Sequence, residues 1–117
     1  MMVVLLVAAV VGAGLLPAGA AGATVKRVSI KNMAFTPRTI TVKAGTKVTW
    51  KNADGVVHNV TSANSMKTTA SVTGLFASAS LSNGKRFSFT FRKKGTFYYE
   101  CTIHASMASM HGKVIVK

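Results

Sequence analysis

The chain is poor in several residue types, and each shortage excludes a class of structure or function. Its 117 residues include one cysteine, three histidines and two acidic residues. One cysteine cannot form an internal disulfide, so the fold must be held by its hydrophobic core. Helical periodicity is scarce beyond residue 24, which leaves β-strands as the main expected element.

The first 23 residues carry no charge and differ in composition from the rest. Met1–Leu16 is apolar or small throughout, and Pro17 and an Ala-Gly-rich stretch follow it. An apolar core of about 14 residues is short for a membrane span, which needs about 20. We predict a signal peptide over residues 1–23 and a domain over 24–117, exported to the periplasm or to the cell exterior. No Lys or Arg precedes the apolar run, so an uncleaved N-terminal anchor is the alternative.

The rest of the chain is strongly basic. Fifteen Lys and Arg stand against only Asp54 and Glu100, and the net charge is +13. A field of this sign attracts acidic proteins, anionic lipid or nucleic acid. Export argues against nucleic acid, and the longest basic run, Arg92–Lys94, falls at an expected turn rather than in an arginine-rich arm. We therefore expect a monomer whose partners are acidic protein surfaces or an anionic membrane surface.

Alternation of apolar and polar residues with a period of two dominates beyond residue 24. Phe87, Phe89 and Phe91 alternate with polar residues, as in a half-buried strand. Turn signals separate similar runs at Val28–Ile30, Ile40–Val42, Val48–Trp50, Phe97–Cys101 and Val114–Val116. This pattern predicts an all-β domain, a Greek-key β-sandwich or barrel of about seven to eight strands. Residues 64–82 fit no element clearly and could hold an irregular strand or a short helix.

One group of residues offers distinctive chemistry. Cys101 is followed by His104, Met107 and Met110, and His58 is the one upstream histidine. A thiolate, two imidazoles and a weak axial thioether are the ligands of a type 1, or blue, copper site. A free thiol in an exported protein is also a liability unless something such as a metal occupies it.

Strand alternation gives the direction of the thiol. On the strand expected to end at Cys101, Phe97 and Tyr99 share its inward face. Tyr98 and Glu100 are expected to point outward. A metal bound here would lie between a rigid strand end and the following loop, near the surface but shielded from bulk water.

Seven short motifs follow one another along nearly all of residues 24–117. They are Phe35–Pro37, Ile40–Gly45, Val48–Asn52, His58–Val60, Phe87–Phe91, Gly95–Cys101 and Met110–Val116. In this order they resemble the cupredoxins, specifically the plastocyanin and amicyanin type. The resemblance implies a cupredoxin-like fold and one type 1 copper ion, bound by His58, Cys101 and His104 with a methionine as the axial ligand.

The axial methionine is Met110 or Met107. Met107 gives the C-x-x-H-x-x-M spacing of the amicyanin-like loop, whereas Met110 holds the M-x-G-K-V-x-V position before the last strand, where the family places its axial ligand. Strand register determines side-chain direction, while loop length varies easily. We therefore predict Met110 as the ligand and Met107 as a hydrophobic residue on the loop near the copper.

Roles can also be predicted for residues outside the ligand set. Asn59 is expected to hydrogen-bond across the site and to tie the His58 loop to the Cys101 strand. His111 is expected to be an exposed bystander. Trp50 and the phenylalanine series are expected to form the core.

The resemblance implies an electron carrier. The edge of His104 would reach the surface as the electron port, within a small apolar docking patch formed by Ile103, Ala105, Ala108 and the unused methionine. The tyrosine port of plastocyanins is replaced by Glu100, so a second route is not expected. We predict an exported blue-copper protein that shuttles single electrons between redox partner proteins with acidic docking surfaces.

A copper-binding or delivery protein is the alternative function. Met66, Met107, Met110 and His111 could supply additional ligands to such a protein. Copper oxidases and nitrite reductases need further histidines, and the chain has only three. We therefore do not expect an enzyme.

Overall fold

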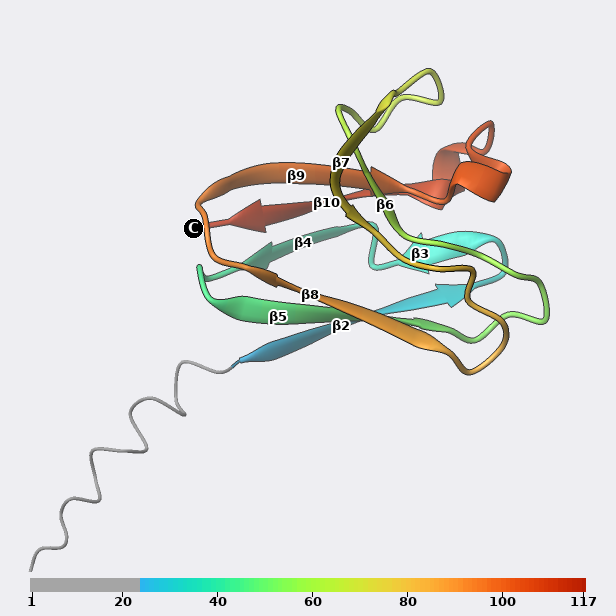
Figure 1. Ribbon diagram of the computed structural model, residues 1–117, viewed down its shortest axis with the longest axis horizontal. Coiled ribbons are helices and arrows are strands. Elements are labelled where there is room, and N and C mark those ends of the chain that lie inside the picture. Colours follow the sequence, from blue (N-terminus) through green and yellow to red (C-terminus); the bar gives the residue numbers. More distant parts are fainter. Residues whose placement is uncertain (1–23) are drawn as a thin grey trace, which may run out of the picture.

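The computed structural model describes residues 24–117, which form two β-sheets packed against each other (Figure 1). One sheet has the strand order β3-β2-β5-β8, and the other has the order β4-β10-β9-β6-β7. The nine strands described are β2 (Val25–Lys31), β3 (Ala34–Thr36), β4 (Thr39–Val42), β5 (Thr46–Asn52), β6 (Thr61–Ala63), β7 (Val72–Ala77), β8 (Arg86–Phe91), β9 (Gly95–Glu100) and β10 (His111–Val116). The predicted signal peptide or anchor lies outside the described residues.

The all-β sandwich predicted from the sequence is confirmed, with nine strands rather than seven to eight. Every run of alternating residues forms a strand, because one face of each run is buried between the sheets. Residues 64–82, which the sequence left open between an irregular strand and a short helix, contain the strand β7. It lies at a sheet edge and buries only Phe76, so it shows no alternation that a sequence could reveal.

Aromatic side chains from both sheets fill the core around Trp50. The Trp50 ring is fully buried on β5, and its centroid lies 5.1 Å from that of Tyr99 and 6.0 Å from that of Phe76. Tyr99 in turn meets Phe35 edge-on at 4.7 Å. Such offset and edge-on pairs stabilise the core beyond the burial of their area, and the sandwich is therefore a rigid support for what lies at its ends.

β9 runs from one end of the sandwich to the other. Its first residue, Gly95, leaves the β8–β9 turn, and Cys101 follows its last residue. Six strand residues span about 20 Å, so Cys101 and this turn lie at opposite ends of the domain; Figure 1 shows β9 running from the turn to the end where the chain folds back into β10. All nine strands and the core belong to residues 24–117, which is enough chain to fold alone. None of the helices in this part of the chain is long and apolar enough to cross a membrane.

Candidate metal centre

Three side chains from distant segments meet at the end of β9. His58 lies in the β5–β6 connection and pairs with Leu81 through two backbone hydrogen bonds. Cys101 follows β9, and His104 ends the short 3₁₀ helix η1 (Thr102–His104). The Cys101 Sγ lies 3.7 Å from His58 Nδ1 and 3.5 Å from His104 Nδ1, and the three ligand atoms all lie within 4.8 Å of one another.

The two distances from the Cys101 sulfur to the imidazole nitrogens fit one small metal ion. Two donor atoms about 2.1 Å from a common ion and about 120° apart lie about 3.6 Å from each other. The Cys101 thiol is unpaired and fully buried, and a soft sulfur with two imidazole nitrogens is a donor set that suits copper.

The loop after Cys101 holds His104 in place by repeating one local turn. The His104 N–H donates to Cys101 O (3.1 Å), the Met107 N–H to His104 O (3.0 Å), and the Met110 N–H to Met107 O (3.0 Å). Each turn spans three residues, and the last one belongs to a second 3₁₀ helix, η2 (Ala108–Met110). Side chains three residues apart stack in such turns, so His104 returns over the thiol.

The two methionines of this loop have different environments. Met110 is fully buried, and its backbone oxygen accepts a 3.0 Å hydrogen bond from the Cys101 N–H. Met107 is 39% exposed. Ile103, beside the His104 imidazole, is 50% exposed. The Met110 backbone therefore lies against that of Cys101 and its side chain is buried, whereas Met107 and Ile103 contribute apolar surface to the outside of the loop.

Asn59 links the two segments that carry the cluster. Its side-chain amide donates to Thr102 Oγ1 (2.8 Å), and its Oδ1 accepts from the Thr102 N–H (3.0 Å). Its own N–H points at Cys101 Sγ at 3.4 Å. A hydrogen bond to sulfur and a clamp between strand end and loop both limit movement of the ligand atoms.

The sequence interpretation missed Asp54, which orients His58. The Asp54 Oδ2 lies 2.8 Å from His58 Nε2, which leaves Nδ1 facing the thiol. Burial alone would raise the pKa of this carboxyl, but hydrogen bonds from Met33 N–H, His58 and Asn32 N–H outweigh burial and lower the pKa. The carboxylate is therefore charged, and a charged acceptor on Nε2 holds the imidazole in the tautomer that binds metal through Nδ1. The sequence did contain a signal for this contact: Asp54 is one of only two acidic residues, and it lies four positions before His58.

Replacing Asp54 is expected to weaken the metal site without removing a ligand. We expect Asp54→Ala to lower copper affinity about tenfold or more, and to raise the reduction potential, because the imidazole loses the partner that strengthens its donation to copper(II). Competition titration with a chelator and voltammetry measure the two effects.

Asp54→Asn is the matched control, because it keeps the shape and one acceptor oxygen but removes the charge, and should show a smaller change of the same sign. Chemical unfolding of the metal-free variants separates this effect from the loss of the hydrogen bonds that Asp54 accepts from Asn32 and Met33. Unaltered affinity and potential in both variants would mean that the contact with His58 is incidental.

Two sequence predictions about exposure are wrong. Glu100 was expected to face outward and His111 to be an exposed bystander, yet they are 4% and 0% exposed. The two residues pair across β9 and β10, with Glu100 Oε1 3.7 Å from His111 Nδ1. The loop folds back over this face, where His111 Nε2 lies 2.6 Å from Ala105 O and Arg38 donates to Ala108 O and His111 O. Alternation assigns a face to a residue, but it does not show what covers that face.

Comparisons with known proteins agree with this donor set. The family model described as copper binding proteins, plastocyanin/azurin family, matches residues 23–117. Amicyanin-alpha of Methylorubrum extorquens is 34% identical over 97 residues, which cover 83% of this chain and 74% of that protein. Chloroplastic plastocyanin of Silene latifolia subsp. alba is 36% identical over 115 residues, which cover 94% and 69%. The solved purple cupredoxin from Nitrosopumilus maritimus matches with a TM-score of 0.70 at 29% identity, covering 79% of this chain and 99% of that one.

Proposed function

Because the chain belongs to the plastocyanin/azurin family of copper-binding proteins, we propose that it is an exported blue-copper protein that shuttles single electrons between redox partner proteins. The observation that carries this proposal is the cluster of His58, Cys101 and His104, whose donor atoms converge on one point. We assign these three residues as copper ligands and Met110 as the axial ligand. Copper bound there supplies a one-electron couple.

The surrounding residues hold the donor atoms in nearly one arrangement. Cys101 and His58 are fully buried, and Asp54 and Asn59 restrain them by hydrogen bonds. Copper(I) favours soft sulfur and copper(II) accepts imidazole nitrogen, so a fixed set of both kinds suits either oxidation state. Little rearrangement between the two states is what rapid electron transfer requires.

His104 is the proposed electron port. It is the one member of the cluster that is only partly buried, and exposed Ile103 and Met107 lie on the same loop. Val56 and Val57, on the segment before His58, add two further exposed apolar side chains at 48% and 41%. A small apolar surface of this kind suits brief, weak encounters with partner proteins.

The alternative of copper delivery gains no support from His111, the one additional histidine proposed for it. His111 is buried behind the loop and its Nε2 is engaged with Ala105 O. It therefore does not add a ligand to the surface near His104. A single site with one partly exposed histidine is better suited to moving electrons than to handing over a metal.

Comparison of Met110→Leu with Met107→Leu tests the ligand assignment. We expect Met110→Leu to shift the visible absorption and EPR spectra and to raise the reduction potential, because loss of a thioether that also binds copper(II) favours copper(I). Met107→Leu is the matched control, with the same substitution on an exposed residue, and it should leave both spectra unchanged.

Two results would contradict the proposal. A shift with Met107→Leu but not with Met110→Leu would reverse the axial assignment. A copper-loaded wild-type protein that is colourless when oxidised, and that binds only copper(I), would reject the electron carrier and favour delivery.

A further inference from the structure

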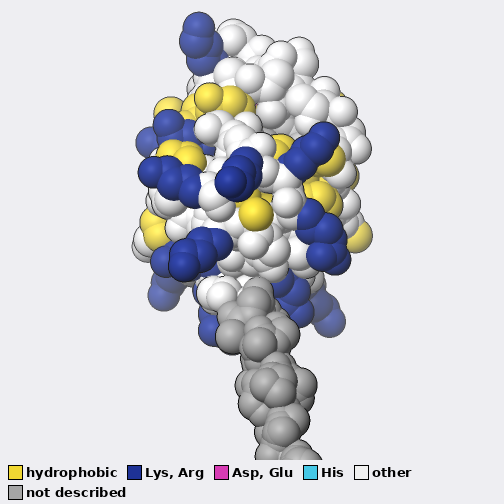
Figure 2. Space-filling model, turned by 90° about the vertical axis from the view of Figure 1, so that its left-hand side faces the viewer, with side chains coloured by type: hydrophobic (Ala, Val, Ile, Leu, Met, Phe, Trp, Pro, Cys, Tyr) yellow, Lys and Arg dark blue, Asp and Glu magenta, His cyan; other side chains and the backbone are white. Residues whose placement is uncertain are grey.

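The end of the sandwich away from the ligand cluster carries a dense group of cations. The β4–β5 and β8–β9 turns meet there, since the Gly45 N–H donates to Phe91 O (2.7 Å) and the Lys117 N–H donates to Val42 O (2.9 Å). We call this end the basic pole, and its seven exposed cations are Lys26, Lys43, Lys47, Arg92, Lys93, Lys94 and Lys117. Figure 2 views this end and shows Lys and Arg side chains spread across it with apolar side chains between them.

No acidic side chain offsets these charges. The sequence has two acidic residues. Asp54 is bonded to His58, and Glu100 precedes Cys101 at the far end of β9. The field of the seven cations is therefore neutralised only by ions or by a partner.

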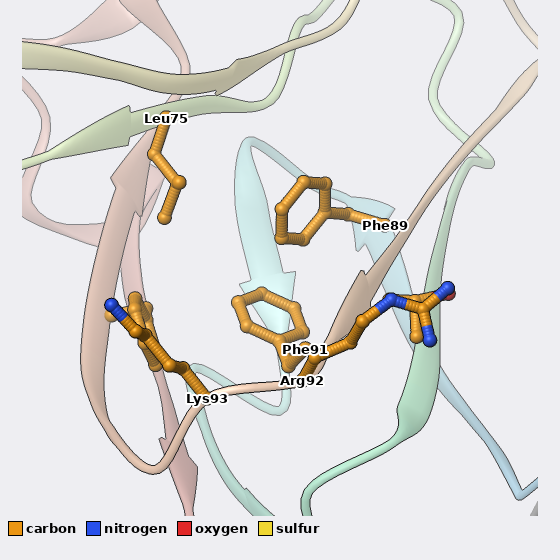
Figure 3. Close-up of a pocket in the computed structure, with 7 residues that line it drawn as sticks. Leu75, Phe89, Phe91, Arg92 and Lys93 are labelled. Carbon is orange, nitrogen blue, oxygen red and sulfur yellow. The ribbon is translucent and has the colours of Figure 1, made fainter.

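An apolar cavity opens beside the basic pole. Its volume is about 570 Å³, and it lies between the two edge strands β7 and β8, where the sandwich is not closed by a strand. Leu75 from β7 and Phe89 and Phe91 from β8 face this common space (Figure 3). Arg92 and Lys93 of the pole also line it, so the cavity and the pole form one continuous surface.

We propose that the basic pole and this cavity dock the domain on an anionic lipid bilayer. Clusters of four to eight Lys and Arg next to a membrane bind anionic headgroups, and the adjoining cavity can accept acyl chain or the apolar part of a lipid. An acidic protein would match the charge but would give the open aromatic cavity no obvious occupant.

The position of residue 24 points to the same partner. The Lys47 N–H donates to Thr24 O (2.9 Å), so the described chain begins at the basic pole. In the alternative in which residues 1–23 stay uncleaved as an anchor, the apolar run Met1–Leu16 would join the domain at this end. Docked in this way, the domain would hold Cys101 about 20 Å from the pole. His104 would then face the soluble phase. Its role as an electron port there rests on the proposed function, whereas the docking on lipid does not depend on that function.

Flotation of copper-loaded residues 24–117 with lipid vesicles tests the proposal. We expect binding to phosphatidylcholine vesicles containing about one third phosphatidylglycerol, and little binding to pure phosphatidylcholine. The triple variant Arg92→Glu, Lys93→Glu, Lys94→Glu should lower the partition coefficient by at least about a hundredfold, since each cation lost near an anionic surface costs about fivefold and the added glutamates are repelled as well. Leu75→Ser, a change at a half-exposed cavity residue, should lower the fraction that stays bound at high salt.

The matched control changes the same net charge at the other end of the sandwich. In this control, Lys31→Glu, Lys51→Glu, Lys85→Glu, the partition coefficient should fall by less than about fivefold, because charges at that end lie beyond a Debye length from the lipid. Equal losses in the two triple variants, or equal binding to neutral vesicles, would overturn the proposal. Binding to polyglutamate without binding to vesicles would assign the pole to an acidic protein instead. The visible spectrum of the copper-loaded protein should stay unchanged in all of these variants, since none of them alters a proposed ligand, so failure of docking is distinguishable from failure of the copper assignment.

Discussion

Replacing Cys101 by serine is expected to abolish the intense visible absorption of the copper-loaded protein. The band requires a thiolate bound to copper, and this thiol is the only one in the chain. Copper affinity should fall by at least about a hundredfold, since even partners outside the ligand set are worth about 10–100-fold. Absorption, EPR and a competition titration measure the loss.

The serine variant should retain the fold, which makes the result interpretable. Serine has nearly the same shape as cysteine, and Cys101 is a single core residue that directly follows the end of β9. Far-ultraviolet circular dichroism of the metal-free protein should match that of the wild type. A serine variant that is folded and still intensely coloured would show that the thiolate is not a ligand.

Gly112→Ala is expected to lower the free energy of unfolding by about 3 kcal/mol, near the upper end of the usual cost of overpacking a core. A methyl group at Gly112 would lie 2.5 Å from the Tyr99 ring and hydroxyl and 2.7 Å from the backbone oxygen of Arg38. Tyr99 cannot retreat, because Phe35 and Trp50 pack against it. The Arg38 oxygen accepts the Lys113 N–H at 2.8 Å, so the backbone is held as well. Urea unfolding of the metal-free protein measures the change.

Gly55→Ala is the matched control for Gly112→Ala. A methyl group at Gly55 would meet no atom within 4 Å, and stability should change by less than about 0.5 kcal/mol. If Gly112→Ala were as stable as this control, β9 and β10 would have to be less closely packed at Tyr99 than the structure shows. Because Gly112 follows Met110 and His111, we also expect the destabilised variant to bind copper more weakly.

The sequence was most informative where burial repeats along the chain. Strands with one buried face, such as β5 and β8, alternate visibly and were predicted. β7 was left open between an irregular strand and a short helix, because an edge strand that buries only Phe76 leaves no periodic trace. Glu100 and His111 were wrongly predicted to be exposed, because a sequence pattern does not show that the loop between them folds back over this face. Arg38, from a distant segment, holds that loop in place.

What the sequence by itself determined is the kind of fold and the group of candidate metal ligands. Local spacing brings Cys101, His104 and the methionines onto one strand end and loop, and alternation turns the thiol inward. Only the tertiary structure decided which distant groups complete the arrangement. Asp54 reaches His58 Nε2, the loop closes over His111, and seven cations gather at the end opposite the thiol. These features depend on how strands far apart in the chain lie side by side, and residue spacing carries no information about that distance.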